Sequence, residues 1–341
     1  MKLLSVAIPC YNSANYMRKC IDYMLSCGEE MEIIIVNDGS TDKTLEIARE
    51  YEKEFPTIVK VVDKENGGHG SAVNAGLEVA TGLYFRVCDS DDFLEVNALN
   101  ILLKNMREAV ASKNEPDAFF TNYVYDHQFD HTTKTNSLAR QMPANRLFTW
   151  NEMGHWRLAD YMLMHSMTLK TEKLRASGMK LPEHCFYVDE IYCYQPLPYL
   201  EKLYYLDIDL YWYFIGRPDQ SVTVENMKKR YNMQLTVIRE MFKPYTYPDL
   251  KKYPKKLRKY MIHLLRIMTT VAMSYVFMDK GKQRVADYKQ FLKDVKAMNP
   301  TLYRALFHHG YMPLLRSFPT WFSVRAYPFG YRICAKKLKL G

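Results

Sequence analysis

Residues 82–92 read GLYFRVCDSDD, a short apolar run that ends in three aspartates within four positions. The apolar part, Leu83–Cys88, predicts a buried β-strand. Carboxylates this close repel one another, and a fold tolerates them when a positive charge lies among them. A divalent cation such as Mg²⁺ or Mn²⁺ is the simplest such charge, because hard cations prefer oxygen ligands and often share them with substrate phosphates. A solvated acidic turn is the alternative interpretation.

The first hundred residues alternate between stretches typical of strands and of helices. We predict strands at Leu3–Pro9, Glu32–Val36, Ile58–Val62 and Leu83–Cys88, and helices at Asn15–Ser26, Thr41–Glu54 and Ser71–Ala80. This alternation predicts an α/β fold in which helices flank a mainly parallel, Rossmann-like sheet. Ligands of such sheets bind beyond the carboxyl ends of the strands.

Polar clusters follow the first, second and fourth of these strands. They read Pro9-Cys10-Tyr11-Asn12, Asn37-Asp38-Gly39-Ser40 and Asp89-Ser90-Asp91-Asp92. The carboxyl ends of parallel strands lie at the same edge of a sheet. We therefore expect the three clusters to converge at that edge. The glycine-rich segment 66–71 precedes a predicted helix, where flexible backbone beside a helix N-terminus suits a phosphate or a sugar. A plain connecting loop is an equally good interpretation of that segment alone.

The rest of the chain is less regular. Ala118–Tyr125 and Leu203–Tyr213 predict two further strands, and residues 126–150 predict a loop or hairpin. After about residue 224 the apolar residues follow helical spacing. We therefore expect a catalytic domain over residues 1–224 and a helical, basic region over residues 225–341.

Charge is divided unequally between these two parts. Residues 1–224 contain 22 Lys and Arg against 32 Asp and Glu, whereas residues 225–341 contain 25 against 6. The net charges are therefore −10 and +19, and the basic part favours an anionic partner. Segment 321–341 mixes aromatic and basic residues, which suits an anionic membrane surface, although a solvated helical cap is the alternative. We expect no nucleic-acid partner, since no known binding module is present.

Composition favours a cytoplasmic protein. The seven cysteines form no C-x-x-C pair, which favours reduced thiols over a disulfide framework or a zinc site. No basic segment precedes the first predicted strand, so we expect no signal peptide. Residues 261–278 come closest to a membrane span, but they contain His263 and Arg266, and we do not expect them to cross a bilayer.

Two later motifs each allow two interpretations. The acidic pair Asp189-Glu190 could supply a general base, or it could be a charged pair that favours a helix start. Arg217, in a Gly-Arg-Pro segment after the last predicted strand, could bind a phosphate oxygen, or it could be a surface arginine in a turn.

The order of all these motifs resembles the family 2 glycosyltransferases of the GT-A fold, over about two thirds of the chain. The likeness is strongest to bacterial enzymes that build capsule, cell-wall or exopolysaccharide sugars. It implies an inverting, metal-dependent transfer of sugar from a nucleotide-sugar donor, commonly a UDP-sugar, to a saccharide or lipid-linked acceptor. It also implies an enzyme of the cytoplasm, peripheral at the inner face of the cell membrane.

The resemblance also implies roles for individual residues. Asp91 would bind Mg²⁺ or Mn²⁺ directly, while Asp89 would bind the metal or the ribose. Asp189 would be the catalytic base, with Glu190 as the fallback, because valine replaces the glutamate of the family's Glu-Asp pair. Donor contacts would come from Pro9, Tyr11, Asn12, Asp38, Gly39, Gly68, Asn74, Asp89 and Arg217.

Two other classes of protein stay open. A nucleotidyltransferase could share a related nucleotide-binding sheet and metal, but it would usually carry a basic glycine-rich loop after the first strand, which Cys10–Ala14 is not. A catalytically silent glycosyltransferase-like binding subunit is the second alternative, because the Glu-Asp pair is altered.

Overall fold

The computed structural model describes residues 1–127, 130–216, 224–278 and 281–313. The chain divides into two compact units. The first comprises Met1–His155 and Met162–Gly216, and the second comprises Trp156–Tyr161 and Arg217–Gly341. Two predictions fall outside the described residues, namely the phosphate contact of Arg217 and the membrane-binding segment 321–341.

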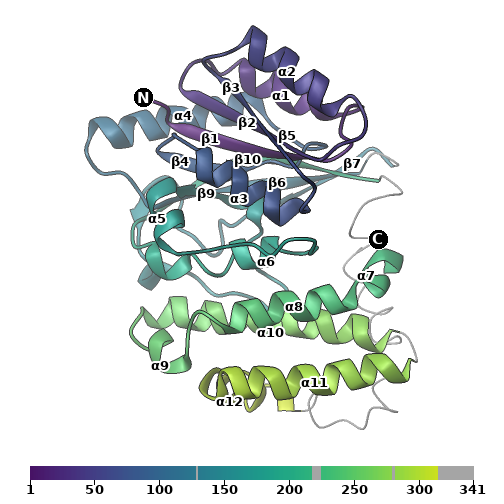
Figure 1. Ribbon diagram of the computed structural model, residues 1–341. Coiled ribbons are helices and arrows are strands. Elements are labelled where there is room, and N and C mark those ends of the chain that lie inside the picture. The colour runs from purple at the N-terminus through teal and green to yellow at the C-terminus, as the bar shows by residue number, and fades with distance from the viewer. Residues whose placement is uncertain (128–129, 217–223, 279–280, 314–341) are drawn as a thin grey trace. The chain divides into compact units, whose positions relative to one another are not determined.

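The first unit is built on one mixed sheet (Figure 1). Its strands are β1 (Leu4–Cys10), β2 (Met31–Asp38), β3 (Val59–Lys64), β4 (Tyr84–Val87), β5 (Phe93–Leu94), β6 (Ala118–His127), β7 (Thr132–Asn136), β8 (Leu147–Phe148), β9 (Met167–Lys170) and β10 (Leu203–Ile215). They lie in the order β3-β2-β1-β4-β9-β6-β10-β5, while β7 pairs with β6 and β8 with β10. Strands β1 to β4 pair in parallel, as do β6 and β10, whereas β9 runs antiparallel between β4 and β6.

Helices cover both faces of this sheet. They are α1 (Met17–Leu25), α2 (Thr44–Glu54), α3 (His69–Val79), α4 (Val96–Ala111), α5 (Thr171–Ala176) and α6 (Asp189–Tyr192), with 3₁₀ turns η1 (Trp150–Glu152), η2 (Met164–Ser166) and η3 (Leu197–Tyr199). Helices α1, α2 and α4 share one face and α3 packs on the other (Figure 1). This double cover explains why the run Ile33–Val36 is apolar at every position and wholly buried.

The second unit is helical. Its helices are α7 (Val224–Lys229), α8 (Tyr231–Phe242), α9 (Tyr247–Leu250), α10 (Lys255–Phe277), α11 (Lys282–Met298) and α12 (Pro300–Phe307). The segment Trp156–Tyr161 belongs to this unit because Trp156 packs on Tyr260, with ring centroids 4.4 Å apart, and His263 donates to the Asp160 carbonyl.

Helix α10 is long and apolar enough to cross a membrane by length and composition alone. We did not expect this because of His263 and Arg266. The helix is a core element of its unit, since 67% of its most apolar window is buried inside the protein. Burial among α8, α11 and α12 accounts for its apolar character without a bilayer.

The structure confirms the predicted α/β class, the mostly parallel sheet and the C-terminal helices. The early strands and helices occur within a few residues of their predicted bounds, and the predicted loop or hairpin after β6 contains β7. The short strands β5 and β9 were not predicted, because two to four residues carry too little periodicity.

Gly76 lets α3 approach the sheet closely. A Cβ atom at this position would lie 2.7 Å from the Cβ of Ala7 on β1, closer than two carbons can pack. Gly76→Val should therefore overpack the contact and lower the free energy of unfolding by about 1–3 kcal/mol. Urea denaturation would measure this. The matched change Glu78→Val, at an exposed position of α3, should stay within about 0.5 kcal/mol, and equal effects of both would contradict the argument.

Candidate active site

Asp92 is a buried carboxylate that ties the loop after β4 to strand β10. The Tyr211 hydroxyl donates to its Oδ2 at 2.5 Å, and the Phe214 backbone N–H donates to its Oδ1 at 2.8 Å. The Tyr211 hydroxyl also accepts the backbone N–H of Asp89 at 3.1 Å. Burial raises the pKa of Asp92 well above its usual value, and repulsion from Asp91 and Asp89 raises it further.

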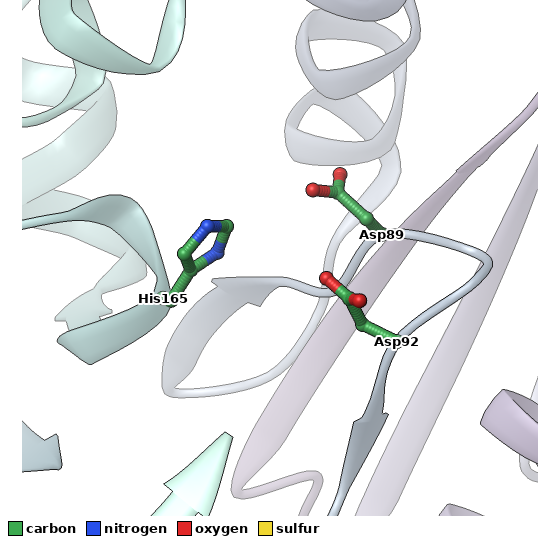
Figure 2. Close-up of side chains that lie close together, drawn as sticks. All are labelled: Asp89, Asp92 and His165. Carbon is green, nitrogen blue, oxygen red and sulfur yellow. The ribbon is translucent and has the colours of Figure 1, made fainter. Parts of the chain in front are cut away.

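His165, on η2, faces these aspartates (Figure 2). Its Nδ1 atom is buried and has no hydrogen-bond partner among the residues that the structure describes. The ring stacks on Tyr211 with centroids 4.4 Å apart, and the His165 carbonyl accepts a hydrogen bond from the buried guanidinium of Arg86. Burial lowers the pKa of His165 to about 4, so the imidazole is neutral at pH 7 and can act as a ligand.

The residues around this point fit a divalent cation. Asp89, Asp92 and His165 each offer a ligand atom, and these atoms lie within 4.8 Å of one another. Two carboxylates and a neutral imidazole with an unpartnered nitrogen form a mixed oxygen and nitrogen donor set. Asp91, which the sequence favours as the direct ligand, does not belong to this group of three. The possible metal site thus shares Asp89 with the site predicted from the sequence, and it adds Asp92 and His165.

His69, the first residue of α3, contacts the same carboxylate loop. Its Nε2 lies 2.9 Å from Oδ1 of Asp89. Burial alone would lower the pKa of His69, but the hydrogen bond to Asp89 and the charges of Asp89 and Asp189 raise it above its ordinary value. The sequence places His69 in the glycine-rich segment without suggesting this partner.

Asp38, at the end of β2, fastens the glycine-rich loop. Its carboxylate accepts the backbone N–H groups of Gly67 at 2.9 Å and Gly68 at 2.7 Å, as well as the Lys64 ammonium at 2.8 Å. Gly39 follows with a φ of +70°, and a Cβ atom there would lie 2.7 Å from the backbone nitrogen of Asn66. Asp38, predicted as a donor contact, is therefore also the anchor of the glycine-rich loop.

The loops after β1 and β2 are bound to each other. The Asn12 side chain accepts the Thr41 backbone N–H at 2.8 Å, and the Asn12 N–H donates to the Ser40 hydroxyl at 3.0 Å. Pro9 is buried in β1, whereas Tyr11 is 53% exposed and open to a ligand. A cavity of about 560 Å³ beside these loops contains none of the predicted site residues; its lining is Ala14, Asn15, Thr41, Asp42, Lys43, Glu46 and Ile47.

Asp189 begins α6 and lies near the charges of His69 and Asp89. Burial raises its pKa above the ordinary value, His69 opposes this increase, and Asp89 adds to it. A carboxylate with a raised pKa accepts a proton more readily than an ordinary aspartate, as a general base requires. Glu190, the fallback, is the next residue of the same first turn.

The segment before α6 is fastened to α3 and the glycine-rich loop. The Asn74 amide bonds to both backbone groups of Leu181, at 2.8 and 3.0 Å, and the His184 N–H donates to the Gly67 carbonyl. His184 and Tyr187 hold positive φ values of 48° and 66°, which few residues of these types adopt. Asn74, predicted as a donor contact, thus positions the segment that carries Asp189.

The structure therefore brings together Asp89, Asp189 and the glycine-rich loop. Sequence reasoning missed His165 and Tyr211. His165 lies in the irregular stretch between predicted strands, and no motif marks it. Tyr211 could have been noticed as one member of an alternating Tyr211, Tyr213 pair on a predicted strand.

Comparison with known proteins agrees with this fold. Residues 5–163 match the sequence profile of the family described as glycosyl transferase family 2. The chain is 44% identical over 103 residues to a chondroitin synthase of Pasteurella multocida, covering 30% of this chain and 11% of that protein. It is 30% identical over 235 residues to the glycosyltransferase GlyA of Streptococcus pneumoniae, covering 64% and 31%. The chain thus spans less than a third of the length of either relative.

Among solved structures, residues 1–349 of S. aureus TarS superpose with a TM-score of 0.68 at 19% identity, covering 97% of this chain and 91% of that one. This likeness concerns the fold. Residues 5–163 thus match glycosyltransferase family 2, and the chain has the GT-A fold. The family resemblance read from the motifs is confirmed.

Tyr211→Phe would remove the hydroxyl that holds Asp92. The buried carboxylate would then lack one of its two donors, so the free energy of unfolding should fall by about 1–3 kcal/mol. Chemical denaturation would measure the change. Tyr204→Phe, at the half-buried start of the same strand, is the control. A loss no larger than in that control would mean that the Tyr211 hydroxyl does not support the carboxylate loop.

Proposed function

We propose that this protein transfers a sugar from a UDP-sugar to an acceptor hydroxyl with inversion at the anomeric carbon. The observation that carries the proposal is the convergence of a cation-binding group, Asp89 with Asp92 and His165, and a carboxylate of raised pKa, Asp189. The TarS structure has been solved in complex with UDP-GlcNAc, which supports a UDP-sugar as the donor.

The donor would lie along the ends of β1, β2 and β4. Tyr11 is exposed beside β1 and suits a stacked uracil, with Pro9 and Asn12 shaping the same loop. Asp38 and Gly39 hold the glycine-rich loop, whose residue Gly68 precedes the N-terminus of α3 and suits the diphosphate. Arg217, outside the described residues, would add a cation to the phosphates.

The transfer is a single displacement. The acceptor oxygen forms a bond to the anomeric carbon while the bond from that carbon to the diphosphate oxygen breaks. UDP leaves with the electron pair of that bond, and the proton of the acceptor hydroxyl passes to Asp189. A bound divalent cation would offset the charge that develops on the diphosphate. Asp89 and His165 would hold this cation, with Asp92 as a buried support and Asp91 as a further carboxylate.

A mixed oxygen and nitrogen donor set suits Mn²⁺ better than Mg²⁺, which prefers oxygen alone. The acceptor would be a saccharide or a lipid-linked sugar in the synthesis of a bacterial surface polysaccharide, and one of the relatives is a chondroitin synthase. The basic part of the chain, residues 225–341, would favour a cytoplasmic position at the inner, anionic face of the membrane.

Asp189→Asn tests the catalytic base. The variant should bind UDP-GlcNAc as the wild type does but lose at least ~10²-fold in kcat, the typical contribution of a general base. Radiolabelled transfer would give kcat, and calorimetry would give donor affinity. Glu190→Gln, next in the chain, is the matched control and should keep most of its activity.

The pH dependence of kcat provides a second test of Asp189 as the base. Asp189 accepts a proton only when ionised, and burial raises its pKa. The wild-type kcat should therefore fall with decreasing pH at values above the ordinary aspartate range, and Asp189→Asn should lack this dependence. A loss of donor affinity as large as the loss of kcat would instead make Asp189 a structural residue.

His165→Gln tests the metal centre. Removing an imidazole ligand should raise the Mn²⁺ concentration for half-maximal transfer by at least ~10-fold. Electron paramagnetic resonance should show weaker Mn²⁺ binding without any donor present. Asp89→Asn should lose Mn²⁺ binding more fully, and His155→Gln, at an exposed position, should change nothing.

Asp91→Asn belongs in the same titration. A loss equal to that of Asp89→Asn would add Asp91 to the ligands, as the sequence predicts. Unchanged Mn²⁺ binding in both Asp89→Asn and His165→Gln would contradict the proposed centre.

A further inference from the structure

A row of aromatic rings lies on one face of the paired strands β6 and β10. The two strands run parallel, and their register places Tyr123 beside Tyr211 and Tyr125 beside Tyr213. Ring centroids are 5.4 Å apart between Tyr123 and Tyr125, and 5.7 Å apart between Tyr125 and Tyr213. Side chains two positions apart on a strand share a face, so the row follows directly from the register.

The rings of the row differ in how deeply they are buried. Tyr123 and Tyr211 are buried, and the Tyr211 hydroxyl is used by Asp92. Tyr125 and Tyr213, one pair further along, are only half-buried. We call Tyr125 and Tyr213 the aromatic wall. A fully buried ring completes a core, but a half-buried pair at the end of a sheet leaves ring surface for a ligand.

The aromatic wall lies between the two chemical centres of the site. On one side, the Tyr213 ring lies beside the tilted ring of His165, with centroids 4.9 Å apart. Burial raises the pKa of Tyr213, and the charges of Asp92, Asp89 and Asp91 raise it further. On the other side, the turn η2, which carries His165, packs against β6 and β10 and also against α6, whose first residue is Asp189. The wall therefore lies near both the base and the carboxylate loop.

The chemistry of these groups excludes a phosphate as the occupant of the wall. The face of an aromatic ring carries a negative quadrupole, and the neighbouring carboxylates add negative charge. A neutral sugar suits this surface, because a pyranose ring presents a face of axial C–H groups that packs on an aromatic ring. Of the two sugars in the reaction, the acceptor must reach Asp189, and helix α6, which begins with Asp189, packs against the turn η2 beside the wall.

We infer that Tyr125 and Tyr213 form a subsite for a neutral pyranose ring of the acceptor, which holds its reactive hydroxyl near Asp189. The acceptor is thus a saccharide recognised through its ring rather than through a charged group. This inference rests on the proposed function, because it assigns the second substrate of the same reaction.

Saturation-transfer NMR with methyl β-D-glucopyranoside tests the subsite. Irradiating the aromatic protons should transfer signal to the axial protons of the sugar. The non-transferable phosphonate analogue of UDP-GlcNAc and Mg²⁺ would fill the donor site, so that a remaining signal reports the acceptor site. The double variant Tyr125→Leu/Tyr213→Leu should lose this signal, whereas Tyr125→Phe/Tyr213→Phe should keep it because both rings remain.

Two controls distinguish loss of the sugar subsite from misfolding of a variant. Tyr204→Leu, at the other end of β10, should keep the signal, and thermal unfolding would show that each variant folds. Loss of the wild-type signal when the phosphonate analogue binds would place the sugar in the donor site and overturn the inference. A signal that persists in the folded double leucine variant would overturn it as well. Failure of the analogue to bind at all would instead count against the proposed function.

Discussion

The buried Asp92 carboxylate links two strands that are not neighbours in the sheet. Strands β9 and β6 lie between β4 and β10, yet the loop after β4 reaches β10, where Asp92 accepts from Tyr211 and Phe214 and β5 pairs with β10. The loop therefore runs across the ends of the central strands and brings Asp89 and Asp91 with it. Without hydrogen-bond donors from β10, repulsion among the three carboxylates of this short loop would push the loop away from this edge of the sheet.

The two histidines around this loop differ in their charge at neutral pH. Burial keeps His165 neutral, and the Asp89 partner favours the charged form of His69. Two imidazoles near the same aspartate thus differ in charge because one is enclosed by aromatic rings and the other is paired with a carboxylate. The neutral ring suits a metal ligand, and the charged one suits a neighbour of a diphosphate.

The sequence allowed the strands and the acidic loop to be predicted because these depend on local patterns. A continuous apolar run such as Ile33–Val36 has few interpretations other than a strand buried on both faces. The positions of His165 and Asp92 in the site depend instead on long-range packing. His165 reaches the aspartates only because β9 inserts antiparallel between β4 and β6. The residues near His165 carry no pattern that predicts this pairing. The same holds for Asp38, whose bonds to Gly67 and Gly68 join segments 29 and 30 residues apart.

The electrostatics of the site also constrain what can react there. Residues 1–224 carry a net charge of −10, and several of these carboxylates surround the proposed reaction centre. A diphosphate could approach such a surface only when cations offset its charge, and the proposed donor side combines a possible metal group, His69 and the N-terminus of α3. Among the described residues, the proposed acceptor side presents the half-buried rings of Tyr125 and Tyr213. An anionic acceptor would meet repulsion from Asp189 that these rings do not offset, which favours an uncharged reacting end in the proposed acceptor.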